Sequence, residues 1–456
     1  MDERSKQLSE EKVWKLLFKY SLPATIGMIV NALYNVVDRI FIGRGVGAEA
    51  LAGITIGFPI MLVLMALGML VGVGGAALVS IKLGEQKRNE AELILGNSVL
   101  LLIGITLLVS VVGLVFLDSI LMLFGASQEV LPYAREYLRI ILGGAVFQAI
   151  GFGMNNFIRA EGNPRIAMIT MLIGAITNIV LDPLFIFVFG WGIRGAAYAT
   201  IIAQGVSSIW VLAFFFRQKS LLKIRIENMK LHPAVIKNIL AIGSAPCALQ
   251  FGSSVVITIF NKQLSVYGGD IAISALGIIH SVSMFILMPI IGINQGSQPI
   301  IGYNYGAKRF DRVKETLKSS ITAATMIVSL GFILTRLYPH SLINLFNRDD
   351  LELVRIGTEG LRIFLVTLPV IGFQIVGSNY FMAVGKPKKS MFLSLSRQVI
   401  VLIPMLLILP NFLGLYGVWL AVPVSDTIAS ILTGIFLLKE VKQLNTDNEI
   451  ENNLQE

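Results

Sequence analysis

An asparagine and an aspartate lie four residues apart inside one long apolar segment, which runs from about Ile166 to Phe189. Such a segment predicts a membrane-spanning helix, because roughly 20 apolar residues suffice to cross a bilayer, and Asn178 and Asp182 would share one of its faces. A carboxylate there costs about 2.5–3.5 kcal/mol on insertion scales. Pro183 also removes a helical hydrogen bond. This patch is therefore a candidate functional site, and a buried structural aspartate is the alternative.

The composition predicts an integral membrane protein. Of 456 residues, 55% are hydrophobic and only 14% are charged. The net charge of +9 does not indicate a nucleic-acid partner, because the basic residues lie in short loops between apolar runs. With a single cysteine, Cys247, and three scattered histidines, we expect neither a disulfide nor a zinc site, and no cofactor.

The apolar runs predict an all-α protein with twelve transmembrane helices. The runs lie at about 14–38, 52–80, 93–117, 131–157, 166–189, 194–216, 235–264, 271–301, 316–338, 354–381, 390–410 and 414–438. Basic loops follow the even-numbered runs, whereas the loops after odd-numbered runs carry fewer cations. Because cytoplasmic loops carry the excess of lysine and arginine, we expect a multi-pass protein of the plasma (inner) membrane with both termini cytoplasmic.

The two halves of the chain read as copies of each other. Pro246 follows Pro23 by 223 residues, and Pro387 follows Pro164 by the same interval. Duplicated six-helix units are a transporter architecture. The predicted division is an N-terminal lobe at 1–216, a basic cytoplasmic linker at 217–237, a C-terminal lobe at 238–440 and a polar cytoplasmic tail at 441–456.

On this duplicated frame the sequence resembles the multidrug and toxic compound extrusion (MATE) family, in its DinF-like and MepA-like branch. The resemblance covers nearly the whole chain. It is carried by Pro23, Asp38, Phe41-Ile-Gly43-Arg-Gly45, Arg159-Ala-Glu-Gly162 and Asn178-Ile-Val-Leu-Asp182-Pro183. It implies two six-helix lobes that form a V around a central cavity. It also implies ion-coupled export of organic cations in exchange for Na⁺ or H⁺.

The resemblance places a coupling site in the N-terminal lobe, on Asp38, Asn178, Asp182 and Thr200. Pro23, about four helical turns before Asp38, can let the first span bend when that acid changes charge, and an ordinary tolerated kink is the alternative. Two carboxylates with neutral oxygens suit a hard cation such as Na⁺. They equally suit a proton, because two acids crowded in low dielectric favour sharing one. The second repeat lacks these acids, since Phe260 stands at the position equivalent to Asp38.

Further polar residues in the apolar runs are candidates for lining a substrate cavity. They are Tyr34, Asn35, Asn155, Gln204, His280, Arg397 and Asp426. Such residues also serve as contacts between helices. Arg397 and Asp426 in particular can pair as a structural bridge, which we favour over a substrate role. His280 can titrate near neutral pH, although a structural histidine is the simpler interpretation.

Three functions are compatible with these features. The first is a monomeric antiporter for small amphipathic cations. The 16 methionines and 26 phenylalanines of the chain favour a broad range of substrates. The alternative is a flippase for lipid-linked precursors or other amphiphiles, which would need more cationic residues within the membrane than Arg397. An intramembrane enzyme is the third; the sequence lacks a zinc-protease HExxH motif, and the Asp38/Asp182 pair is its only candidate catalytic dyad. We therefore expect a transporter and not an enzyme.

Overall fold

The computed structural model describes residues 3–124, 126–217, 220–346 and 350–455, and over these residues every regular element is a helix. This is the expected solution for apolar segments in lipid, because a helix satisfies its backbone hydrogen bonds internally. In the first half the elements are α1 (Glu3–Glu10), α2 (Val13–Gly45), α3 (Ala48–Gly84), α4 (Arg88–Val115), α5 (Leu117–Leu123), α6 (Leu131–Ala160), α7 (Pro164–Pro183), the π-helix η1 (Leu184–Val188) and α8 (Gly192–Phe216).

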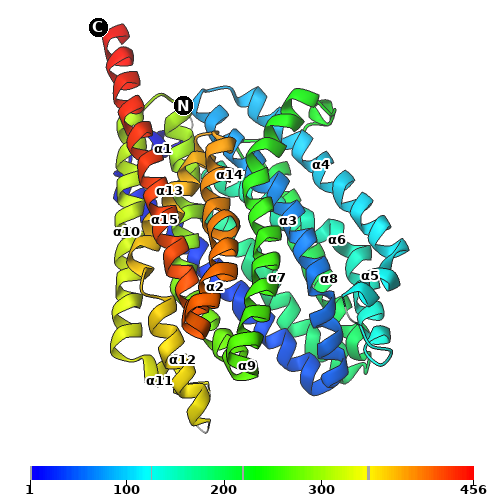
Figure 1. The fold of residues 1–456 in the computed structure, drawn as a ribbon. Coiled ribbons are helices and arrows are strands. Elements are labelled where there is room, and N and C mark those ends of the chain that lie inside the picture. Colours follow the sequence, from blue (N-terminus) through cyan, green and yellow to red (C-terminus); the bar gives the residue numbers. More distant parts are fainter. Residues whose placement is uncertain (1–2, 125, 218–219, 347–349, 456) are drawn as a thin grey trace. The chain divides into compact units, whose positions relative to one another are not determined.

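The second half begins after a short 3-10 turn, η2 (Ile226–Asn228). Its elements are α9 (Pro233–Gly306), α10 (Phe310–Leu337), α11 (Pro339–Asn344), α12 (Leu351–Phe364), α13 (Leu368–Ala383), α14 (Pro387–Leu395), the π-helix η3 (Ser396–Val401) and α15 (Leu402–Gln455). Within this half, Figure 1 shows α11 and α12 at the end of the bundle opposite the C-terminus of α15.

The predicted count of twelve spans is confirmed once the breaks within long helices are considered. Among the described residues, ten helices are long and apolar enough to cross a membrane, and the α12–α13 pair, bent by 52°, makes eleven. One of the ten covers 60 residues and contains Gly414, whose φ of 58° interrupts the helix. Glycine adopts this left-handed conformation without a steric penalty. Division there yields the twelfth span.

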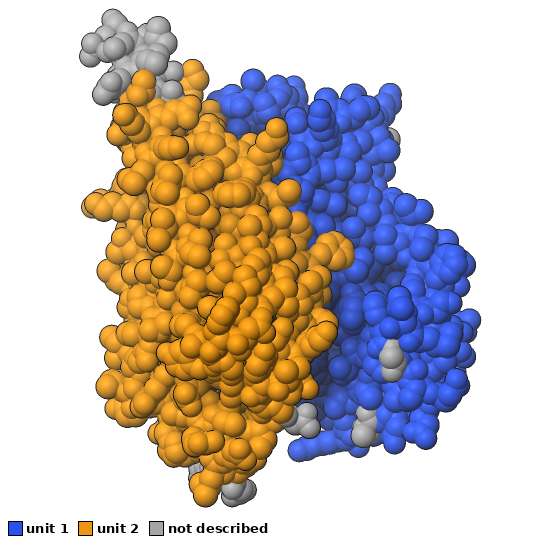
Figure 2. Space-filling model, viewed as in Figure 1, with its two compact units in different colours: residues 1–8, 26–247 blue, residues 9–25, 248–456 orange. Residues whose placement is uncertain are grey.

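The chain divides into two compact units (Figure 2). Unit 1 contains Met1–Leu8 and Ile26–Cys247, and unit 2 contains Ser9–Thr25 and Ala248–Glu456. Each unit has its own apolar core. The core of unit 1 includes Tyr137 and Leu138 of α6, and that of unit 2 includes Phe260 and Trp419. The unit boundaries fall inside α1, α2 and α9, so each of these helices is divided between the two units.

The basic connection after α8 binds two buried acids of unit 1. Oε2 of Glu161 accepts hydrogen bonds from Ser220 Oγ (2.6 Å) and the Leu222 backbone N–H (3.3 Å). Glu92 forms an ion pair with Arg225 at 3.0 Å. These contacts satisfy carboxylates that would otherwise carry a large desolvation cost, so this part of the connection packs on unit 1 as a fixed element.

Candidate functional site

The polar cluster of unit 1 is built from α2, α6, α7 and α8. Asp182 lies one residue before the end of α7, and the π-helix η1 begins directly after Pro183. Proline removes a hydrogen bond from the helical ladder, and π turns within helices are frequent at functional sites. The local sequence therefore explains why the regular helix is interrupted where the carboxylate lies.

The side chain of Asn178 connects α7 to α8. Its Nδ2 group donates to Asp182 Oδ1 at 3.3 Å and to Thr200 Oγ1 at 3.4 Å. All three side chains are buried, and Asp182 is 0% exposed. The predicted shared face of Asn178 and Asp182 is therefore present, and Thr200 faces it from the next helix.

The carboxyl groups of Asp38 on α2 and Asp182 on α7 are close enough to interact electrostatically. Neither forms an ion pair with a lysine, arginine or histidine within the described ranges. Oδ1 of Asp38, Oδ2 of Asp182 and Oδ1 of Asn178 are buried without a hydrogen-bond partner there. Two carboxylates can share a hydrogen bond only if one of them is protonated. The oxygen set fits either one proton or a hard cation, since buried acceptors otherwise remain uncompensated.

Tyr137 of α6 belongs to the same cluster and was not anticipated from the sequence. Its side chain is 2% exposed and interacts electrostatically with Thr200, Asp38 and Tyr34. The available signal was a tyrosine inside an apolar run, because a buried phenol needs a polar partner. Tyr34, which was anticipated, interacts electrostatically with both acids.

The other predicted cavity residues of unit 1 do not hydrogen-bond to the acid pair within the described part of the chain. Asn35 donates to the backbone oxygen of Asn31, one turn earlier on its own helix, at 2.7 Å. Asn155 on α6 is buried, and its Oδ1 has no partner among these residues. Gln204 lies one turn after Thr200 on α8, and its Oε1 is likewise buried without a partner. Pro23 lies inside α2, and its predicted conformational role stays a prediction.

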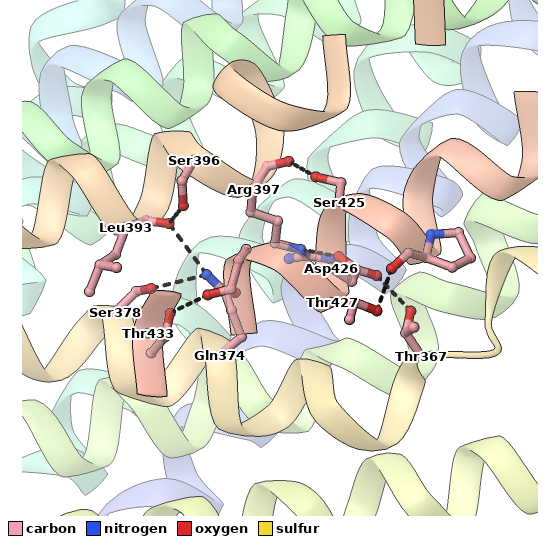
Figure 3. A network of polar contacts seen from close by, with 12 residues as sticks. Thr367, Gln374, Ser378, Leu393, Ser396, Arg397, Ser425, Asp426, Thr427 and Thr433 are labelled. Carbon is pink, nitrogen blue, oxygen red and sulfur yellow. Dashed lines mark hydrogen bonds and ion pairs between the residues drawn. The ribbon is translucent and has the colours of Figure 1, made fainter. Parts of the chain in front are cut away.

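In unit 2, Arg397 and Asp426 form an ion pair within a larger polar network (Figure 3). Arg397 Nε donates to Asp426 Oδ1 at 2.6 Å, and Thr367 Oγ1 donates to Asp426 Oδ2 at 3.1 Å. The Ser425 hydroxyl donates to the backbone oxygen of Arg397. Arg397 lies in the π-helix η3, so unit 2 also places a charged side chain where its helix departs from regular geometry. The His280 side chain is exposed on α9.

Comparison with known proteins identifies the family to which this arrangement belongs. The MatE family model matches the chain twice, over residues 23–184 and 246–408. The chain belongs to the MatE family. The two matches also confirm the internal duplication, because their starts are 223 residues apart, the interval that separates Pro23 from Pro246.

MATE proteins of known sequence and structure match over almost their entire length. The multidrug export protein MepA of Staphylococcus haemolyticus is 28% identical over 446 residues, which are 98% of each chain. A solved outward-facing conformation of a multidrug resistance MATE family transporter superimposes with a TM-score of 0.91 at 26% identity, covering 98% of this chain and 100% of that one. A transporter from Pyrococcus furiosus matches with the same TM-score and identity, covering 98% of this chain and 99% of its own. The binding pocket of that protein is described as having reverse polarity, which suggests a different function. This chain is thus a multi-pass MATE transporter, and its substrate must be inferred from its own residues.

Proposed function

We propose that the protein is a secondary antiporter that exports amphipathic organic cations in exchange for H⁺ or Na⁺. The observation that carries this proposal is the electrostatic interaction of Asp38 with Asp182, neither of which forms an ion pair among the described residues. Two acids in a membrane-spanning bundle are too costly to be retained as an uncompensated structural feature. A cation or a proton compensates them, and its release and rebinding can be coupled to transport.

The residues of the cluster have distinct proposed roles. Asp38 and Asp182 supply the charge that holds the coupling ion, while Asn178 and Thr200 supply neutral oxygens and fix the spacing of α7 and α8. Tyr137 orients Thr200. The ion drives transport only if it binds the two conformations of the carrier with different affinities, because equal affinity shifts no equilibrium.

The substrate class follows from charge and from the relatives. A cationic substrate competes with the coupling ion for the same negative charge, which makes the exchange obligatory. The relatives' description as multidrug exporters supports a broad range of compounds. The flippase alternative would need clustered cations for pyrophosphate, whereas Arg397 is already paired with Asp426. We further propose that the protein acts as a monomer in the plasma membrane with both termini in the cytoplasm.

The test is ethidium transport by the purified protein in proteoliposomes, under an imposed gradient of either Na⁺ or H⁺. We expect uphill ethidium movement with one of the two gradients. Asp182→Asn should abolish this movement while the protein still elutes as a folded species in size-exclusion chromatography. Glu49→Gln, which neutralises an exposed acid outside the cluster, should leave it unchanged. Full gradient-driven transport by folded Asp182→Asn protein would refute the proposed coupling site.

A further inference from the structure

A cavity of about 510 Å³ lies in unit 2, and none of its lining residues is among those labelled in Figure 3. It is lined by side chains of α11, α12 and the part of α15 that follows Gly414. Arg355, Thr358, Glu359 and Arg362 of α12 line it on one side. Their spacing of three, four and seven residues places them on one helix face. His340 of α11 and Tyr416 of α15 complete the polar lining.

The three charged groups of α12 in this cavity are not paired. Residues three or four apart on a helix are neighbours and commonly form ion pairs, as Lys314 and Asp311 do on α10 at 2.9 Å. Arg355, Glu359 and Arg362 form no ion pair with any residue in the described ranges. Oγ1 of Thr358 is buried without a hydrogen-bond partner in the same part of the chain. The cavity thus presents two guanidinium groups, one carboxylate and one unsatisfied hydroxyl.

These groups together determine the kind of ligand that would satisfy them. Guanidinium groups match the oxygens of a phosphate, and a hydroxyl can donate a further hydrogen bond. A carboxylate instead favours an ammonium group. A purely anionic ligand would be opposed by Glu359, and a purely cationic one by both arginines. A ligand that carries a phosphate and a neighbouring ammonium satisfies the whole set.

The surroundings of the cavity are apolar and exposed. Leu351 is 81% exposed and lines the cavity, and Tyr416 on the opposite side is 47% exposed. Phe412, four residues before Tyr416, is 79% exposed. Large exposed apolar side chains at one end of a membrane-spanning bundle face acyl chains and the interfacial region. The ligand is therefore an amphiphile with its charged end in the cavity.

We propose that this cavity binds the headgroup of a phospholipid in which a phosphate diester carries a primary ammonium, as in phosphatidylethanolamine. Arg355, Arg362 and Thr358 bind the phosphate, and Glu359 binds the ammonium. Binding here is separate from the export of organic cations, because the cavity contains neither the acids nor the neutral oxygens of the unit 1 cluster.

The test is native mass spectrometry of the full-length protein in detergent, titrated with phosphatidylethanolamine. Arg355→Gln combined with Arg362→Gln should weaken lipid binding at least tenfold. Lys262→Gln combined with Arg336→Gln removes the same charge from residues outside the cavity lining and should leave binding unchanged. Glu359→Gln should weaken phosphatidylethanolamine binding and strengthen phosphatidylglycerol binding, because the ammonium partner is lost together with the opposing charge.

Three results would overturn the proposal. Equal affinities of the cavity variant and its control would show that the lipid binds elsewhere. Tighter binding of phosphatidylglycerol than of phosphatidylethanolamine by the unchanged protein would contradict the role of Glu359. Displacement of the lipid by soluble phosphoethanolamine at equal concentration would show that the cavity takes a free headgroup and that no lipid is required.

Discussion

Arg397 and Asp426 are joined by a 2.6 Å hydrogen bond between Nε and Oδ1, and Asp426 is 2% exposed. The second carboxylate oxygen accepts from Thr367, so both oxygens of the buried acid are satisfied. A repeat interval of 222 or 223 residues places Ala175 or Gly174 opposite Arg397, and Gln204 or Ala203 opposite Asp426, so neither interval gives unit 1 a charged pair there. This pair is therefore a feature of unit 2 alone, and the duplication does not account for it.

The pair can be tested by a double-mutant cycle. Removing one member of a buried pair typically costs 3–5 kcal/mol, because the other charge is left uncompensated. Asp426→Asn and Arg397→Gln should each lower the melting midpoint and the folded yield, and the double variant should recover part of the loss. Well-folded single variants with altered substrate preference would instead assign the pair to substrate binding.

The two acids of unit 1 should behave as one coupled site. Asp38→Asn and Asp182→Asn should each abolish gradient-driven export, and the double variant should be no worse than either single variant. Asn178→Ala and Thr200→Ala should have milder effects, because each removes a neutral oxygen and leaves both charges. The measurement is the initial rate of ethidium transport by each of these five variants, under whichever ion gradient drives transport by the unchanged protein. Additive losses in the double variant would mean that the acids act separately.

Tyr137→Phe should weaken coupling without unfolding the protein. The substitution removes the hydroxyl that interacts with Thr200 and keeps the ring that packs in the core. A hydrogen bond contributes about 1 kcal/mol, which corresponds to roughly a fivefold change in affinity for the coupling ion. The measurement is the gradient needed for half-maximal transport. Tyr133→Phe, on the same helix outside the cluster, is the matched control, and an equal shift in both variants would exclude a specific role.

Glu161→Ala should destabilise unit 1, because Ser220 Oγ and the Leu222 N–H lose their acceptor. Both donors keep only their local Ser220–Leu222 hydrogen bonds, and a lost hydrogen bond costs about 0.5–1.5 kcal/mol. The melting midpoint in detergent should therefore fall. Glu227→Ala removes an exposed acid from the same connection and should have little effect. Equal midpoints for the two variants would mean that the contact with Glu161 is not stabilising.

The sequence predicted the helices and the duplication well, because apolar length and a constant repeat interval are local or nearly local properties. It also predicted that Asn178 and Asp182 share a face, since helical periodicity alone requires it. The predicted boundaries were less accurate where helices bend. The single run expected at 354–381 is divided into α12 and α13 by a 52° bend. Nothing in the hydropathy of that run indicates the bend.

Tyr137 and the contacts of the basic connection could not be predicted, because they depend on which distant segments meet. Tyr137 reaches Thr200 from another helix, and Glu161 meets Ser220 after an entire helical hairpin has intervened. The connection was predicted as a linker from its basic charge. Arg225 and Ser220 of this connection contact Glu92 and Glu161, so the connection also satisfies buried acids.

These contacts bear on how the protein is synthesised. Glu92 and Glu161 are made well before Arg225, Ser220 and Leu222, so both acids leave the ribosome with only their local partners, Arg88 and Asn163. Unit 1 cannot complete its polar contacts when the sixth span has been inserted, and must await the connection that follows. A nascent chain that stalls at residue 216 would lack the contacts of both acids with the connection, whereas one that extends past residue 225 would have them. The earliest self-sufficient intermediate of biogenesis is therefore six spans together with the segment that follows them.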